Sequence, residues 1–303
     1  MSARTTRARV RLAATGSVLL LPFMALFVAF YIAPILYAIW QSLFTVERDS
    51  PLGLGGAREV FSGLKNYIAA AGDSVFIESF GRVLLFGVVQ VPVMIVLSVA
   101  LAVMLDAASA RAPKLFRSFY FLPYGVPGVV ASIMWGFLYA PGLSPLIDLI
   151  HGMGIEVDFL GRDTVLWSIA NIVIWQSAGY SVLIVAAQLK AIPHDIIESA
   201  TVDGVSGWQL VRHIKLPLIR PAIVLSSVFA IIGTLQLFAE PFVLGPRAPG
   251  ITSGYTPNIQ IYNQAFKLNN YNLAAAESVV LALVIMICSF GFMWVFTRSE
   301  DLK

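Results

Sequence analysis

Six long stretches without a charged residue constrain this chain more than any other feature of its sequence. The stretches are Leu12–Val46, Val83–Leu105, Ser118–Ile147, Thr164–Leu189, Pro221–Ala239 and Ser278–Thr297. A helix needs about 20 mostly apolar residues to cross a bilayer, and each stretch reaches or nearly reaches that length. Only 12% of the 303 residues are charged, about half the share found in soluble domains. The sequence therefore predicts an all-α membrane protein with six transmembrane helices.

We expect these helices to form a single transmembrane domain over residues 1–303. We place the spans near 13–44, 79–106, 117–140, 164–189, 219–241 and 273–297. The apolar run behind the Arg-rich start is too long for the apolar part of a signal peptide. With both termini inside, thirteen of the 20 Lys and Arg residues fall in cytoplasmic segments and six in outer ones. Because cytoplasmic loops carry the excess of such residues, the sequence predicts cytoplasmic termini.

The charge-free stretches contain no Asp, Glu, Lys, Arg or His, and their polar residues are mainly amides and hydroxyls. Carriers coupled to protons or ions usually keep ionisable residues within the membrane, so a secondary carrier is disfavoured. A membrane enzyme would need a nucleophile with its base, paired aspartates or a metal site. We therefore expect no catalytic residue, no metal and no cofactor, and with a net charge of +3 no nucleic-acid partner. A neutral, hydroxyl-rich substrate fits best.

The third stretch contains two prolines and two glycines that disturb helical hydrogen bonding, namely Pro123, Gly125, Pro127 and Gly128. In hydrocarbon, the freed carbonyl groups must be satisfied by protein or by a wet cavity. Two interpretations follow. The segment is either a kinked packing helix or a helix bent around a transport path.

A charged segment at 190–218 separates the fourth and fifth stretches. Pro193 stands where a helix begins, and Gly204 is placed to end that helix in a left-handed conformation. Ser206 and Gln209 have the spacing of a capping box. They predict a second short helix that runs to Leu216, just before Pro217.

The two short helices form a cytoplasmic helix–turn–helix with an apolar face. One interpretation is an amphipathic loop lying flat on the bilayer. The other is a docking element for a partner protein. The residues around it favour the second. Glu198–Ser199–Ala200, then Gly204, then Ile214–Lys215–Leu216–Pro217 resembles the "EAA" signature of ABC importer permeases, with Ser199 where that family has Ala.

That resemblance implies that the segment is the coupling helix, which docks in a cleft of a separate ATPase. The residues it implies for ATPase coupling are Glu198, Ser199, Ala200, Asp203, Gly204, Trp208, Leu216 and Pro217. The chain has no Gly-x4-Gly-Lys-[Ser/Thr] phosphate loop. We therefore expect no enzyme activity in this chain, with ATP and Mg²⁺ bound by the partner ATPase.

Further stretches are similar to the carbohydrate, maltose-type branch of the same family and to its first-permease subtype. They are "FSGLKNYIAA" at Phe61–Ala70, "LPYGVPGVVASIMWGFLYAPGLSPLIDLI", and "WQSAGYSVLIVAAQLKAIPHDIIESATVDG". The chain departs from the branch at Leu244–Ile251, where "LGPRAPGI" replaces a T-x-GGP turn. The resemblance implies a subunit for sugar import in a bacterial cytoplasmic membrane. Its partners would be a second permease, two ATPase subunits or a homodimeric ATPase, and an external binding protein.

In that branch, polar and aromatic residues of the spans flanking the coupling segment touch the sugar. The matching positions here are Ser177, Tyr180 and Thr234, with Gln176 and Gln236 as neighbours. The competing interpretation is that these side chains are hydrogen-bonding contacts between helices. An ABC permease for glycerol phosphate or a polyamine is the alternative function. It is disfavoured because the charge-free stretches hold neither Lys and Arg nor carboxylates.

Overall fold

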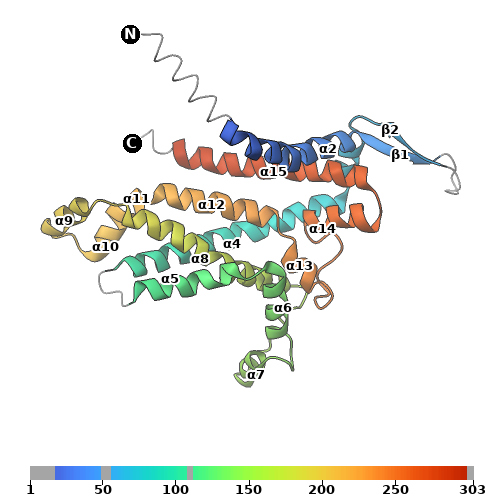
Figure 1. The fold of residues 1–303 in the computed structure, drawn as a ribbon. Coiled ribbons are helices and arrows are strands. Elements are labelled where there is room, and N and C mark those ends of the chain that lie inside the picture. Colours follow the sequence, from blue (N-terminus) through green and yellow to red (C-terminus); the bar gives the residue numbers. More distant parts are fainter. Residues whose placement is uncertain (1–17, 49–55, 108–111, 299–303) are drawn as a thin grey trace, which may run out of the picture. The chain divides into compact units, whose positions relative to one another are not determined.

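A computed structural model describes residues 18–48, 56–107 and 112–298, and these are mostly helical (Figure 1). Five helices are long and apolar enough to cross a membrane: Val18–Ser42, Ser74–Asp106, Val165–Lys190, Arg220–Leu244 and Tyr271–Arg298. A bent pair, Pro113–Gly125 and Gly128–Leu138, has the composition of one more span. The predicted helical membrane protein is confirmed.

Some predictions fall outside the described residues. They include the start of the first span and the basic residues Arg4, Arg7, Arg9, Arg11, Arg111 and Lys303. Within the described residues, the chain divides into two compact units: residues 1–72 with 264–280, and residues 73–263 with 281–303.

The first unit contains a β-hairpin that the sequence analysis did not predict. Its elements are η1 (Val28–Ile32), α2 (Ala33–Ser42), β1 (Phe44–Arg48), β2 (Ala57–Phe61), α3 (Lys65–Gly72) and the beginning of α15 (Tyr271–Arg298). Phe44 pairs with Phe61 in an antiparallel register. Asn66 of α3 donates hydrogen bonds to the carbonyl oxygens of Ser42 and Phe44, at 2.8 and 2.7 Å. The asparagine of the "GLKNY" stretch thus holds α3 against the end of α2.

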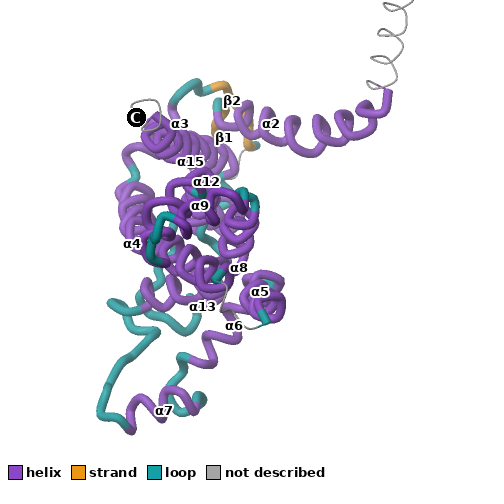
Figure 2. The backbone as a smooth tube through the Cα atoms, turned by 90° about the vertical axis from the view of Figure 1, so that its left-hand side faces the viewer, coloured by secondary structure: helices purple, strands orange, loops and turns teal. Residues whose placement is uncertain are grey.

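The second unit is built around α4 (Ser74–Asp106), the longest helix. Beside it pack α8 (Val165–Lys190) and α12 (Arg220–Leu235), and α5 (Pro113–Phe121) lies against α8 (Figures 1 and 2). Small residues line the contact between α4 and α8, where Ser98 Oγ donates to the carbonyl oxygen of Ala178 at 3.2 Å. Lipid provides no hydrophobic driving force between helices, so helices in a membrane associate through close packing. Small side chains allow their backbones to approach closely.

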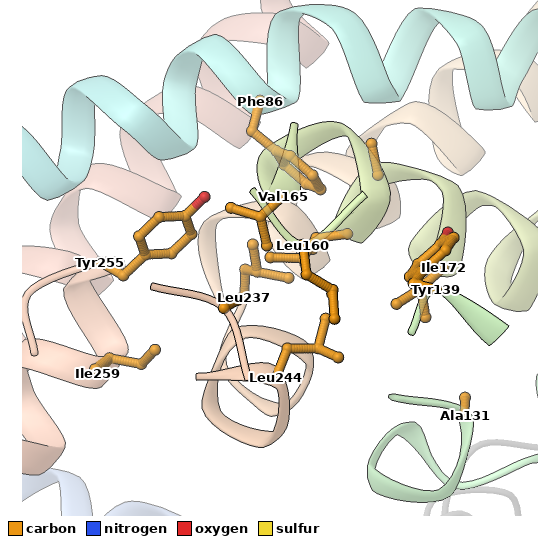
Figure 3. Packing of buried hydrophobic residues seen from close by; sticks show 13 residues of the cluster. Phe86, Ala131, Tyr139, Leu160, Val165, Ile172, Leu237, Leu244, Tyr255 and Ile259 are labelled. Carbon is orange, nitrogen blue, oxygen red and sulfur yellow. The ribbon is translucent and has the colours of Figure 1, made fainter. Parts of the chain in front are cut away.

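A buried apolar cluster closes the end of this unit that lies away from α9 (His194–Val202) (Figure 3). It joins α4 and α8 to α6 (Gly128–Leu138), α13 (Ala239–Leu244) and α14 (Pro257–Tyr262). The short helix α7 (Pro145–Gly152) follows α6. Phe86, Val165 and Leu244 are almost completely buried in this cluster.

Four of the long helices, α4, α8, α12 and α15, extend past the charge-free stretches and so include ionisable residues. Asp73 caps α4 by accepting from the backbone N–H of Val75 at 2.9 Å. The helix therefore starts early enough to contain Glu78 and Arg82. Similarly, α15 contains the buried Glu277. The expectation that the spans lack charge is correct for the stretches but wrong for whole helices, because the caps set the helix ends.

Arg82 holds the loop that precedes α14. Its guanidinium donates to the carbonyl oxygen of Tyr255 at 2.8 Å and lies 4.8 Å from the centre of that ring. Burial raises the pKa of Tyr255 to about 12, and the opposing effect of Arg82 is smaller. The phenol of Tyr255 stays neutral near pH 7. Arg82 therefore contacts the carbonyl oxygen and the ring face of Tyr255, and it forms no ion pair with the phenol.

Candidate functional site

The segment between α8 and α12 folds as two short helices joined by a tight turn at one end of the second unit (Figure 1). The first is α9, which begins directly after Pro193, and the second is α10 (Gly207–Leu210). Gly204 has a φ of 76°, as predicted. A Cβ on Gly204 would meet nothing within 4 Å, so only the backbone conformation requires glycine here.

The predicted capping box is present. Ser206 Oγ accepts from the backbone N–H of Gln209 at 3.4 Å, and Gln209 Oε1 accepts from the backbone N–H of Ser206 at 2.9 Å. These two bonds satisfy N–H groups that a helix start otherwise leaves without partners. They fix the angle at which α10 leaves the turn.

Several residues predicted for coupling lie exposed on this segment. Glu198, Ser199, Asp203 and Gly204 are exposed, whereas Ala200 is buried inside it. The Trp208 side chain is 69% exposed. A surface with a large exposed aromatic side chain is typical of a protein contact. The segment thus presents a face that its own chain does not cover.

The predicted end of the second helix is wrong. Helical structure continues after α10 through η3 (Val211–Lys215), a π-helical turn, and α11 (Leu216–Leu218), so it passes through Pro217. A π-turn changes the hydrogen-bond spacing just before the proline, which has no N–H to donate. Leu216 packs against the apolar cluster of Ala102, Val182 and Ile219. It therefore acts in packing within this chain.

An ion pair that the sequence analysis missed joins this segment to α4. Lys215 Nζ lies 2.7 Å from Asp106 Oδ2, with only 10% and 19% of the two side chains exposed. A cavity of about 540 Å³ lies beside the pair and is also lined by Lys190 and His194. The sequence signal for this ion pair was the single Asp106 directly after the second charge-free stretch. However, its partner lies 109 positions away in the chain.

The bent pair expected as the third span is broken beside α8. Its two halves meet at an angle of 97°, after the short helix η2 (Leu122–Gly125). Gln176 Nε2 of α8 donates to the carbonyl oxygen of Val126 at 2.6 Å. The bond satisfies a carbonyl group that the break leaves without a helical partner. Gln176 thus makes a contact between α8 and the break, and its contact with substrate stays a prediction.

Tyr180 lies between the broken span and α12. Its ring stacks on that of Tyr124, with centroids 4.9 Å apart, and meets Phe229 of α12 edge-on at 6.3 Å. Tyr124 and Phe229 are 45% and 48% exposed. We call Tyr124, Tyr180 and Phe229 the aromatic row. Ser177 lies one helical turn before Tyr180 and is half-buried.

The two remaining candidates lie apart from this group. Thr234 is buried, and its Oγ1 donates to Gln90 Oε1 of α4 at 2.9 Å. Gln236 is exposed at the C-terminal end of α12. The hydrogen bond joins α12 to α4, which is the helix-contact role that competed with substrate binding. Substrate contact by Thr234 and Gln236 stays a prediction.

The described residues contain no group of three His, Cys, Asp or Glu side chains that could hold a metal ion. The predicted site residues come together in two places, the exposed helix pair of α9 and α10 and the aromatic row. Both are attached to α8, which ends at Lys190, just before the helix pair.

Comparison with known proteins identifies the family of this chain. The family described as "Binding-protein-dependent transport system inner membrane component" matches residues 94–300. The lactose transport system permease protein LacF of Rhizobium radiobacter is 31% identical and covers 91% of each chain. The sn-glycerol-3-phosphate transport system permease protein UgpA of Yersinia enterocolitica is 30% identical, over 88% of this chain and 89% of the relative.

A solved structure has the same fold. It is that of a bacterial ABC transporter involved in the import of the acidic polysaccharide alginate, with a TM-score of 0.81. It covers 97% of this chain and 99% of its own, at 19% sequence identity. At that identity, the likeness concerns the arrangement of helices.

Proposed function

We propose, because this chain belongs to the binding-protein-dependent transport system inner membrane components, that it is the permease subunit of an ATP-driven importer of neutral sugars. The aromatic row beside the broken span is the observation that carries the substrate class. Aromatic faces and hydroxyl groups suit a ligand that has apolar C–H faces and many hydroxyl groups. LacF, a lactose transport permease, supports the same class.

The alternative cargo is an anion such as glycerol phosphate, which the relative UgpA favours. A phosphate group is usually bound by Arg or Lys through charge-assisted hydrogen bonds. The candidate residues Ser177, Tyr180, Tyr124 and Phe229 carry no positive charge. A neutral sugar is therefore the better match.

We place the chain in a bacterial cytoplasmic membrane with six spans, counting the bent pair as one, and both termini in the cytoplasm. This places the α9–α10 pair on the cytoplasmic side, where an ATPase can reach it. We assign it to the cleft of that ATPase, with Trp208 and Glu198 in the contact. ATP and Mg²⁺ bind to the ATPase, and a second permease and an external binding protein complete the assembly.

Transport then requires the helix pair to move as a rigid body with the helices behind it. The capping box stiffens the pair, and α8 extends directly from it to the aromatic row. Closure of the ATPase would move α8 and α12, on which Tyr180 and Phe229 lie. The sugar site and the ATPase contact are thus linked through one continuous helix.

Gly204→Ala is expected to weaken the ATPase contact and so to reduce both sugar-stimulated ATP hydrolysis and transport. A left-handed conformation costs an alanine about 1–2 kcal/mol, so the turn would change shape and Trp208 would be misplaced. We expect sugar-stimulated ATP hydrolysis and uptake to fall roughly fivefold or more, as such a cost implies. Gly207→Ala is the matched control, since Gly207 also has open space but no positive φ. Equal, wild-type activity in both variants would contradict the role of the turn.

Uptake into proteoliposomes tests the function. The chain is purified with its associated proteins and reconstituted with the binding protein, and ATP is supplied to the ATPase. We expect neutral sugars such as lactose to accumulate and to stimulate ATP hydrolysis, whereas sn-glycerol 3-phosphate does not. Tyr180→Ala should raise the apparent KM about tenfold through lost stacking and contact area. Tyr37→Ala, at a 66% exposed residue of α2, should not.

The outcomes separate the alternatives. Uptake of sn-glycerol 3-phosphate alone would replace the sugar assignment with the anionic one. If no nucleotide-binding protein co-purifies, the importer assignment itself fails. If sugar is imported but Tyr180→Ala has the KM of the wild type, the aromatic row is a packing feature and the sugar binds elsewhere.

A further inference from the structure

A second cavity, separate from the aromatic row, lies between α6, α7 and the beginning of α8. It has a volume of about 500 Å³, within the range of roughly 300–1,000 Å³ for small-molecule sites. We call it the aromatic pocket. The lining residues that matter here are Trp135, Tyr139, Phe159, Trp167, Ser168 and Asn171. None of its lining residues carries a charge at neutral pH.

Aromatic rings form much of its wall. The rings of Tyr139 and Phe159 are stacked, with centroids 5.2 Å apart, and Trp135 lies 5.4 Å from Tyr139. The side chain of Trp167 is 43% exposed. The negative faces of such rings attract the weakly positive C–H groups of a pyranose. The wall therefore suits the flat face of a sugar ring.

Polar groups accompany these rings. Asn171 Nδ2 donates to the hydroxyl oxygen of Tyr139 at 2.8 Å, and that hydroxyl donates to the carbonyl oxygen of Ser168 at 3.3 Å. The amide oxygen of Asn171 is a further acceptor. The Trp135 Nε1–H is buried and has no acceptor among the described residues. Buried N–H groups of native proteins usually have a partner, and a ligand hydroxyl would supply one.

The pocket is distinct from the aromatic row but connected to it. Asn171 and Tyr180 are nine residues apart on α8, which corresponds to about 14 Å along the helix. Trp167, Asn171 and Trp175 follow each other at four-residue spacing, so they lie along one face. The rings of Trp175 and Trp135 meet edge-on, with centroids 5.8 Å apart.

We propose that the aromatic pocket is a second carbohydrate subsite, which holds a neutral pyranose unit before it reaches the aromatic row. This inference rests on the proposed sugar import. The aromatic pocket lies toward the end of α8 opposite the proposed ATPase contact. Substrate enters an importer at that end. The Trp135 N–H and the Asn171 amide bond sugar hydroxyls, and the partly exposed Trp167 supplies the ring face, with the stacked Tyr139 and Phe159 rings completing the wall.

Single substitutions in the reconstituted transporter test the subsite, with lactose as the probe. Trp135→Phe keeps an aromatic ring but removes the N–H and part of the indole surface, while Asn171→Ala removes the amide. We expect each to raise the apparent KM about threefold to tenfold, the effect of one hydrogen bond, with little change in the maximal rate. Trp294→Phe, at a 60% exposed residue of α15, is the control. Retained maximal uptake shows that each variant is folded.

Protection from labelling provides an independent measurement. Val157 lines the pocket, so Val157→Cys on a Cys288→Ala background places the only thiol there. Lactose should slow its reaction with a membrane-impermeant maleimide, and sn-glycerol 3-phosphate should not.

Suppose that the wild type imports lactose, that the substitutions leave the apparent KM unchanged, and that lactose does not slow the labelling. The subsite is then overturned, while sugar import stands. A pocket filled by lipid or by the partner permease would give that result. If the wild type imports no neutral sugar, the proposed function fails and the subsite fails with it.

Discussion

Gly179→Ala is expected to prevent this chain from accumulating as a folded membrane protein. Gly179 lies where α8 meets the backbone of α5. A Cβ there would overlap the carbonyl oxygen of Tyr120 and lie 3.0 Å from the Cα of Phe121. Both are backbone atoms, so no side-chain rotation relieves the overlap. Overpacking commonly costs about 1–3 kcal/mol, and we expect more here because two helices must separate.

The measurement is the yield of monodisperse protein after mild solubilisation, together with its thermal unfolding midpoint. Gly233→Ala is the matched control, because Gly233 is also helical but a Cβ there would meet nothing within 4 Å. We expect Gly233→Ala to resemble the wild type and Gly179→Ala to aggregate or be degraded. Wild-type yield and midpoint for Gly179→Ala would show that α5 and α8 are farther apart than this arrangement places them.

The second large effect is expected from the Lys215–Asp106 pair. Lys215→Met leaves a mostly buried carboxylate without its cation, which typically costs about 3–5 kcal/mol. Asp106→Asn leaves the mostly buried ammonium in the same position. Because the pair joins the helix pair to α4, each variant should also reduce uptake per ATP hydrolysed. We expect lower unfolding midpoints and weaker coupling in both single variants.

A double-mutant cycle isolates the pair itself. The variant Lys215→Met with Asp106→Leu removes both charges, and replacing a buried pair by apolar residues is often neutral or stabilising. We therefore expect its midpoint to recover. If the single substitutions cost nothing, the pair is solvated in the assembled transporter. If the double variant recovers stability and full coupling, the charges themselves have no part in transmission.

Much of the fold could be predicted because its signals are local in the chain. The charge-free stretches indicated the long helices, and Ser206 with Gln209 indicated the start of α10. Gly204 indicated the left-handed turn. Each depends on residues within one helical turn or on a continuous run. The β-hairpin had only a weak local signal, because "FTVER" alternates over its first four residues whereas "AREVF" does not alternate.

The candidate site was predictable only in part. Tyr180 was selected from the resemblance, but its ring contacts with Tyr124 of the bent pair and Phe229 of α12 were not predicted. Gln176 and Thr234 were selected from the resemblance, and the structure shows Gln176 bonded to the break before α6 and Thr234 bonded to Gln90 of α4. Composition alone does not separate a substrate contact from a packing contact, since both use amides and hydroxyls.

By itself, the sequence determined the class of this protein, its long helices and the exposed helix pair. The length of an apolar run and the residues that cap a helix are both read from neighbouring positions in the chain. Only the tertiary structure decided which helices touch. The pairing of Lys215 with Asp106 and of Thr234 with Gln90 joins residues 109 and 144 positions apart. At the 97° break in the bent pair, Gln176 of α8 likewise bonds the carbonyl oxygen of Val126, 50 positions away. Such contacts depend on the packing of whole helices, which no local pattern specifies.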